Sequence, residues 1–277
     1  MEYNKQGYLN SEFRLFHIID KERKEFDFHY HDFDKLVITI SGNVSYSIEG
    51  KTYKLKPYDL LLVQHNEIHK PIIHDDEIYE RIIVYISPEF LEIYRTNAYD
   101  LGYCFKKAVE ENTHLIRLPK INDHPLFHAI RTLEKSFEND KYASELERKL
   151  LFLELMIELN RASLIRSLDY VHNESFNPKV LKIIEYIQDH LTEDINIDTI
   201  AAKTYMSRYH MMRTFKAETG YTIHEYISQK RLILAKKMLC ENVPVTEVCY
   251  NCGFKDYTSF LRAYKKQYKE LPSSARR

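Results

Sequence analysis

The chain has no long apolar run and few cysteines. No apolar stretch approaches the roughly 20 residues that a membrane-spanning helix needs. The first 16 residues, MEYNKQGYLNSEFRLF, lack the basic segment followed by an apolar segment that is typical of a secretory signal peptide. We therefore expect a cytoplasmic protein with no membrane partner.

Only four cysteines are present, and their number fits a reducing compartment. Cys249 and Cys252 have the spacing of half a zinc site or of a redox pair, but no second pair accompanies them. Both fall at core or turn positions of a predicted helical motif. We expect them to pack as small apolar residues, with no metal bound there.

The overall charge of −1 conceals two parts of opposite sign. Residues 177–277 carry 17 Lys and Arg against 11 Asp and Glu, whereas residues 1–176 carry 23 against 30. With 277 residues and 44% hydrophobic content, the chain is long enough for two ordinary cores. A basic C-terminal part joined to an acidic N-terminal part is expected when only one of them meets phosphate groups.

The basic part contains one supersecondary unit twice. Residues 197–220 predict a short helix, a break at Tyr205-Met206 and a second helix that Ser207 opens. Residues 245–268 repeat this order, with the break at Cys252-Gly253. A short helix, a tight turn and a longer helix with a basic outer face are typical of the helix-turn-helix motif, whose second helix enters the DNA major groove. Two copies predict a monomer that reads two adjacent grooves.

The N-terminal part is predicted to be β-structure from about residue 12 to residue 90. Apolar or alternating segments at 36–40, 44–48, 53–55, 60–63 and 81–86 are separated by turn signals such as Ser41-Gly42-Asn43. Many short strands without intervening helices favour an antiparallel barrel or sandwich.

Two amphipathic helices follow the strands. Asp123 and Pro125 indicate a helix start, with one face made by Leu126, Ile130, Leu133 and Phe137. A longer helix from Ser144 carries a stripe made by Leu146, Leu150, Leu153 and Ile157. Such a stripe can pack inside the subunit or form a dimer interface, and its spacing alone does not choose between them.

A polar stretch at 171–177 is interpreted as a linker. Asn177 and Pro178 then indicate the start of the next helix.

The chain resembles the AraC/XylS family of bacterial transcription regulators. The C-terminal residues that carry the resemblance are Phe215-Lys216, Gly220, Tyr226-Ile227, Arg231-Leu232, Ala235, Leu239, Gly253-Phe254-Lys255-Asp256, Phe260, Arg262, Lys265-Lys266, Pro272 and Arg276. Three residues depart from the family pattern: Tyr205 and Lys269 replace glycines, and Ala275 replaces an aromatic residue. The resemblance implies an α+β chain with three parts. They are a cupin-like antiparallel β-barrel with two following helices at 1–170, a linker at 171–177 and an all-α domain with two helix-turn-helix motifs at 178–277.

The N-terminal half resembles the cupin-like sensor domain of that family. His29, His31 and His69 fall where metal-dependent cupin enzymes have three histidine ligands, but Lys35 stands at the position of their glutamate ligand. A cation there would repel a metal, so we expect neither a catalytic metal nor a cofactor. The three histidines are interpreted instead as facing an effector or as purely structural residues, and further candidates for the effector pocket are Tyr46, Arg14 and Arg81.

The resemblance implies a ligand-responsive, sequence-specific DNA-binding transcription regulator and not an enzyme. It implies an activator of sugar utilisation genes, with double-stranded DNA, a small-molecule effector such as a sugar, and RNA polymerase as partners of a homodimer. Helix geometry and the family pattern predict that DNA is contacted by Tyr209, Met212, Arg213, Lys216, Tyr257, Thr258, Arg262 and Lys265. Alternatives are a metal-dependent cupin enzyme with a basic appendage and a non-specific architectural DNA binder.

Overall fold

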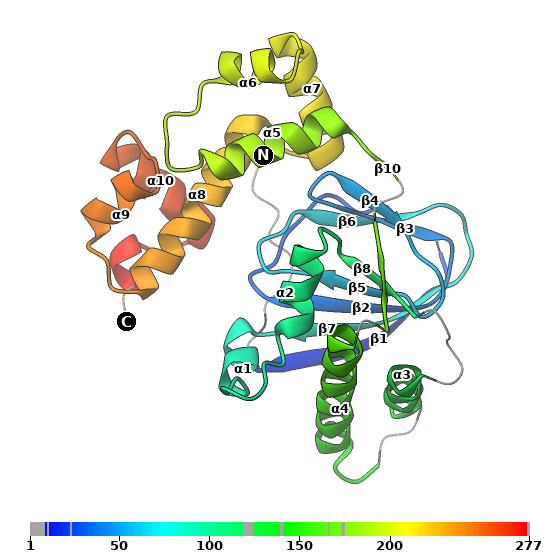
Figure 1. Ribbon diagram of the computed structural model, residues 1–277. Coiled ribbons are helices and arrows are strands. Elements are labelled where there is room, and N and C mark those ends of the chain that lie inside the picture. Colours follow the sequence, from blue (N-terminus) through cyan, green and yellow to red (C-terminus); the bar gives the residue numbers. More distant parts are fainter. Residues whose placement is uncertain are drawn as a thin grey trace. The chain divides into compact units, whose positions relative to one another are not determined.

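The computed structural model describes residues 9, 11–22, 24–118, 124–138, 141–165, 167–172 and 175–275 (Figure 1). Asp123 and Arg276, which the sequence singled out, lie outside these residues. The chain forms two compact units, one spanning residues 4–175 and one containing residues 176–277, and each is described by itself.

The strands between residues 13 and 176 form two hydrogen-bonded sheets. The order of the six-stranded sheet is β1 (Phe13–Asp20), β7 (Tyr79–Ile86), β2 (Asp34–Ser41), β5 (Leu60–Val63), β8 (Leu115–Arg117) and β9 (Asp169–Val171). The order of the four-stranded sheet is β10 (Ser175–Phe176), β4 (Lys51–Lys54), β3 (Val44–Ile48) and β6 (His69–Ile73). Four of the five segments predicted as strands lie within strands, and the segment 53–55 overlaps β4, which ends at Lys54, so this part of the prediction is confirmed.

The two sheets share one interior. Val37 and Ile83 of the six-stranded sheet belong to the same buried cluster as Val44, Tyr46 and Ile73 of the four-stranded sheet. Among the described residues the strands form two sheets and not one closed ring, so the expected barrel is an open, cupin-like sandwich. Side chains alternate along a strand, so residues next to Val37 in β2 point to the opposite face.

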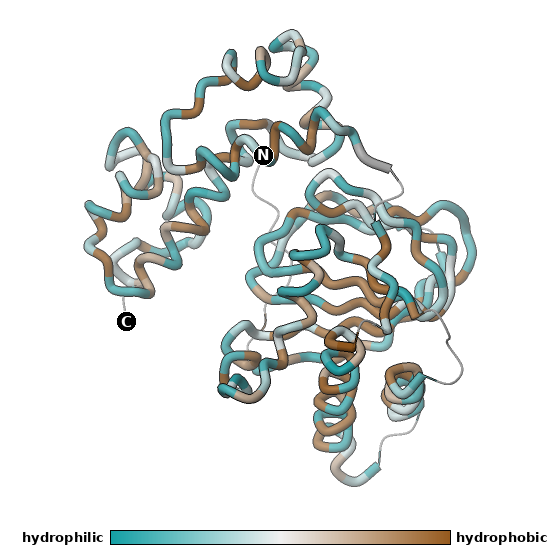
Figure 2. Tube along the Cα trace, in the orientation of Figure 1, coloured by the Kyte–Doolittle hydropathy of each residue, from teal (hydrophilic) through white to brown (hydrophobic). Residues whose placement is uncertain are grey.

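That opposite face of the six-stranded sheet is covered by helices. They are α1 (Pro88–Ile93), α2 (Tyr103–Glu110), α3 (Pro125–Lys135) and α4 (Ser144–Leu164). Leu36 and Ile38 of β2 cluster there with Phe152 and Leu155 of α4. In Figure 2 hydrophobic segments run through these strands and along α4.

Helix α3 begins one residue later than the sequence suggested. His124, and not Asp123, is the N-cap of α3, and its side chain accepts a hydrogen bond from the Leu126 amide. Leu126, Ile130 and Leu133 are buried and Phe137 is partly buried, so the apolar face of this helix is confirmed.

The apolar stripe of α4 is largely on the surface of the subunit. The exposed fractions are 58% for Leu146, 60% for Leu150 and 40% for Ile157, and only Leu153 packs against the core. Internal packing is therefore the wrong interpretation for most of the stripe. The core contacts of α4 are made by another face, which carries Phe152, Leu155, Met156 and Leu159.

The second unit is built from helices. They are α5 (Pro178–Asp189), α6 (Ile197–Lys203), α7 (Arg208–Thr219), α8 (Ile223–Cys240), α9 (Val245–Asn251), α10 (Tyr257–Tyr268) and a short 3-10 helix, η1 (Pro272–Ala275). Both predicted helix-turn-helix units are confirmed, one in α6 and α7 and the other in α9 and α10. Cys249 and Cys252 are buried in the core around α8, as predicted.

Two of the departures from the family pattern adopt the backbone conformation that glycine favours. Tyr205 has φ +54°, between α6 and α7, and Lys269 has φ +59°, just after α10.

Asn177 is the N-cap of α5 and Pro178 its first residue, as expected. β9 and β10 reach into the segment interpreted as a linker. Of the helices described here, none has the length and apolarity to span a membrane.

Candidate DNA-binding face and effector site

The two candidate recognition helices have the same internal layout. Ser207 caps α7 and Asp256 caps α10, each by accepting a hydrogen bond from the amide three residues later. Counted from these caps, Arg213 and Arg262 occupy the same position, the sixth. Met211 and Phe260 are buried at the fourth position, and Phe215 and Tyr264 at the eighth. The sequence repeat is therefore also a repeat in three dimensions.

Most of the predicted DNA-contacting side chains are accessible. The exposed ones are Tyr209, Arg213, Lys216, Thr258, Arg262 and Lys265. Met212 is half-buried, and Tyr257 is half-buried against Phe260, with 6.3 Å between the ring centroids. The Arg213 guanidinium lies 6.0 Å from the centre of the Tyr209 ring. This outer face offers charged, hydroxyl and aromatic groups, which can read base edges as well as phosphates.

Sequence reasoning missed one equivalent pair. His210 and Ser259 both stand three residues after the cap and both are exposed. Residues near the N-terminus of a recognition helix contact base edges in helix-turn-helix proteins. Counting from Ser207 and Asp256 would have found this pair.

Arg231 of α8 connects the two halves of the unit. Its Nε donates to the Leu191 carbonyl at 2.8 Å and its Nη2 donates to the Glu193 carbonyl at 2.6 Å, in the loop between α5 and α6. The same guanidinium lies beside Gly253, where an added Cβ would approach Arg231 Cζ to 3.0 Å. Lys255 also forms an ion pair with Asp194 at 2.8 Å. These contacts join the loop before the first motif to the turn of the second.

Three histidines meet inside the first unit. His29 and His69 form an isolated β-bridge with backbone hydrogen bonds of 3.0 and 2.9 Å in the two directions. His31 follows two residues after His29, so its side chain lies on the same face. The ring centroids are 4.5 to 5.1 Å apart, and the exposed fractions of the three residues are 4%, 4% and 0%. The predicted grouping of these residues is present in the structure.

Hydrogen bonds determine the tautomers of two of these rings. Nδ1 of His29 contacts the Asp27 carbonyl at 2.8 Å, and Nδ1 of His69 contacts the Glu67 carbonyl at 2.9 Å. A carbonyl only accepts, so both Nδ1 atoms carry the proton and both Nε2 atoms present a lone pair. Burial lowers the pKa of His29 to about 4 and that of His69 well below its usual value, which keeps both rings neutral.

A buried lysine and a tyrosine complete this polar interior. Lys35 Nζ donates to the Tyr46 hydroxyl at 3.2 Å, and burial lowers the pKa of Lys35 to about 8. Asp34, the adjacent carboxylate, instead binds the backbone and ring of His65, both at 2.8 Å. The Lys35 side chain therefore lies on the side of the three histidines, whereas the Asp34 carboxylate points away from them.

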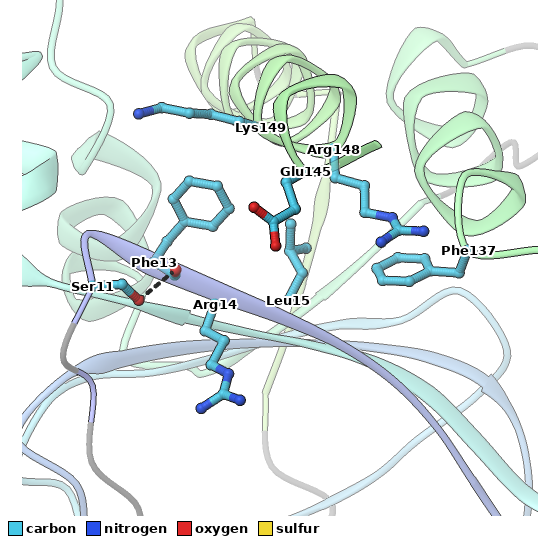
Figure 3. Close-up of a pocket in the computed structure, with 8 residues that line it drawn as sticks. All are labelled: Ser11, Phe13, Arg14, Leu15, Phe137, Glu145, Arg148 and Lys149. Atoms are coloured by element: carbon cyan, nitrogen blue, oxygen red, sulfur yellow. Dashed lines mark hydrogen bonds between the residues drawn. The ribbon is translucent and has the colours of Figure 1, made fainter. Parts of the chain in front are cut away.

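The other two predicted effector residues have different surroundings. Arg81 is buried in an ion pair with Asp20 at 2.6 Å and lies over the Tyr79 ring. In Figure 3, Phe13 and Leu15 point toward α4, whereas Arg14 extends from the opposite face of β1. Arg14 is exposed and its guanidinium lies over Phe16, which contacts Tyr85 at the sandwich interior. The surface pocket of about 540 Å³ in Figure 3 is thus bordered mainly by β1, α4 and Phe137.

A β-sandwich with a buried polar cluster, followed by two equivalent helix-turn-helix motifs, defines a ligand-responsive DNA-binding transcription regulator. The family model of the AraC-like ligand binding domain matches residues 15–156, more than half of the chain. A model of the helix-turn-helix domain matches residues 200–277. The chain belongs to the AraC family.

Similar proteins match either nearly the whole chain or its helical unit alone. The HTH-type transcriptional activator RhaS of Enterobacter sp. (strain 638) is 24% identical over 252 residues, covering 90% of this chain and 86% of that protein. RhaS of Escherichia coli (strain SMS-3-5) is 24% identical over 257 residues, covering 91% and 88%. The structure of ToxT from Vibrio cholerae has a TM-score of 0.38 and 14% identity, covering 95% of this chain and 97% of ToxT. The DNA-binding domain of AdpA in complex with a target DNA has a TM-score of 0.34 and 26% identity, covering 35% of this chain and 88% of that domain.

Proposed function

We propose that the protein is a cytoplasmic transcription activator that binds a specific DNA site and responds to a small effector held between the two sheets. The observation that carries the DNA-binding part is the equivalence of Arg213 and Arg262, exposed at the same distance from their helix caps. Activation is proposed because the curated relatives are named as transcriptional activators. We propose RNA polymerase as a partner and a sugar as the effector, following the family resemblance.

The proposed readout divides the outer faces into two classes. Arg213 and Arg262 each bind guanine through two hydrogen bonds, in adjacent major grooves. Lys216 and Lys265, one turn further along, bind phosphates. Recognition helices on one face of B-DNA lie about one helical turn apart, so one subunit recognises a direct site of roughly 17–20 base pairs.

Binding-site selection with single variants tests this division. Arg213→Ala and Arg262→Ala should each weaken specific binding by about 1–3 kcal/mol and relax base preference in different halves of the site. Lys216→Ala and Lys265→Ala are the matched controls. They should weaken binding to all sequences alike and reduce the salt dependence by about one unit each. If the two arginine variants lose preference at the same positions, or at none, the two-groove proposal is wrong.

We further propose a homodimer through α4. Leu146, Leu150 and Ile157 are exposed on this helix, and Leu153, Ile157 and Leu164 border an adjacent pocket of about 780 Å³. Apolar side chains that repeat along an exposed helix face favour pairing with a second copy of the same helix.

We propose that the sandwich is a sensor and not an enzyme. Lys35 holds the position of the carboxylate ligand of cupin enzymes, and the neighbouring Asp34 is bound to His65. The cupin-enzyme alternative therefore lacks a carboxylate beside the histidines among the described residues. Tyr46, Arg14 and Arg81 remain proposed effector contacts around the three histidines.

A further inference from the structure

The three histidines are arranged as metal ligands. One ring nitrogen from each of His29, His31 and His69 can be chosen so that all three lie within 4.8 Å of one another. Imidazole nitrogens bound to zinc at 2.0–2.1 Å in a tetrahedral site are separated by about 3.3 Å. The rings therefore need to move by only about 1 Å to share one ion.

The hydrogen bonds of the rings also favour a cation. His29 and His69 donate Nδ1–H to backbone carbonyls, the arrangement that orients metal-bound histidines through their other nitrogen. This leaves the Nε2 lone pair of each ring for a ligand. Nε2 of His69 is fully buried and has no hydrogen-bond partner in the structure. A buried lone pair without a partner is costly unless a ligand or a water molecule satisfies it.

The space between the rings also favours an ion over a larger ligand. The three ring centroids are within 5.1 Å of one another, and the rings contact each other at their edges. His31 is also stacked on Phe33 at 4.6 Å, with an interplanar angle of 14°. The β-bridge between His29 and His69 fixes the backbone beneath them.

We propose that His29, His31 and His69 bind one divalent transition-metal ion of the zinc class, with the remaining coordination position open to water or to an oxygen atom of the effector. This inference rests on the proposed function, because it names a metal ion as one ligand of the proposed sensor site. Contrary to the expectation drawn from the sequence, Lys35 does not exclude a metal here, because the three histidine ligands are still grouped. Its charge opposes the binding of a cation, so the affinity is moderate and rises when this charge is removed.

Titration of the full chain with Co²⁺ tests the proposal. The protein, freed of metal with a chelator and carrying no histidine tag, should bind one equivalent and show the visible absorption of cobalt bound to imidazole, which Zn²⁺ then abolishes. His69→Gln and His29→Gln should weaken binding by more than the roughly 10–100-fold that follows loss of an outer hydrogen-bond partner. His128→Gln, on the exposed side of α3, is the matched control and should bind like the original chain.

Lys35→Met provides a second test, which does not depend on removing a histidine. It removes the buried charge, and the affinity for Co²⁺ should rise at least about tenfold. Circular dichroism of each variant shows whether it folds. If His128→Gln lowers Co²⁺ binding as much as His69→Gln, or if Lys35→Met leaves the affinity for Co²⁺ unchanged, the metal is an adventitious ion only and the proposal is wrong. Absence of bound Co²⁺ at one equivalent also overturns the proposal.

The same preparations separate this inference from the proposed function. Specific DNA binding is measured for the metal-free chain, the metal-loaded chain and His69→Gln. If no metal binds while specific DNA binding persists, only the metal inference fails. If metal binds and no DNA sequence is preferred, the proposed DNA readout fails and the metal site stands.

Discussion

Arg231 should determine how firmly the two helix-turn-helix motifs are held together. Its two hydrogen bonds reach the Leu191 and Glu193 carbonyls, and its guanidinium lies beside Gly253. A hydrogen bond from a charged group contributes about 1.5–3 kcal/mol, and water competes for a partly buried guanidinium. We therefore expect Arg231→Met to lower the free energy of unfolding of the helical unit by about 2–3 kcal/mol.

The same Arg231→Met variant should also have a lower affinity for its specific DNA site. If both recognition helices must enter adjacent grooves at a fixed spacing, the bound protein has to restore the geometry that Arg231 maintains. A cost of 2–3 kcal/mol corresponds to an affinity lower by roughly 30- to 150-fold, which sets the upper limit of the effect. Non-specific affinity at the same salt concentration should change far less, because it depends on total charge.

Two further variants isolate geometry from charge. Arg231→Lys keeps the positive charge but loses the planar fork that reaches two carbonyls, so most of the loss should remain. Lys237→Met removes one exposed charge from the same helix and should leave the stability unchanged. Denaturant unfolding followed by helical circular dichroism and fluorescence anisotropy with the selected DNA site measure both quantities. An Arg231→Lys variant as stable and as specific as the original chain would refute the reasoning.

Three other predictions concern the backbone and the assembly. Lys269 has φ +59°, which costs a residue with a side chain about 1–2 kcal/mol, so Lys269→Gly should stabilise the helical unit by about 0.5–1 kcal/mol after the entropy of glycine is included. Gly253→Ala is the opposite case, because φ is +83° and the new Cβ would lie 2.9 Å from the Thr192 carbonyl oxygen. It should lower the denaturation midpoint, and a gain in stability would contradict the geometry. Leu150→Glu should convert the proposed dimer into a soluble monomer in sedimentation, whereas Glu145→Gln on the same helix should not; an unchanged dimer would remove α4 from the interface.

Local signals in the sequence were sufficient for much of this protein. Alternating apolar residues predicted strands such as β3, and Ser207 and Asn177-Pro178 predicted helix starts that the structure confirms. The repeated helix-turn-helix motif was also readable, because helix caps, turns and apolar spacing depend on residues close together in the chain. The start of α3 was placed one residue early, since His124 can cap a helix through its ring nitrogen as Asp123 can through its carboxylate.

Only the tertiary structure revealed the features that depend on contacts between residues far apart in the chain. The stripe of α4 had two possible partners, and only the position of the sheet showed that Phe152 and Leu155 face the core while Leu150 faces outward. His29 and His31 predict a shared face by their spacing, but the bridge to His69 and the hydrogen bonds that set the ring tautomers arise from strand pairing. Strand pairing and helix packing are set by the whole core, so neither the orientation of α4 nor the chemistry of the histidine cluster is contained in any local pattern.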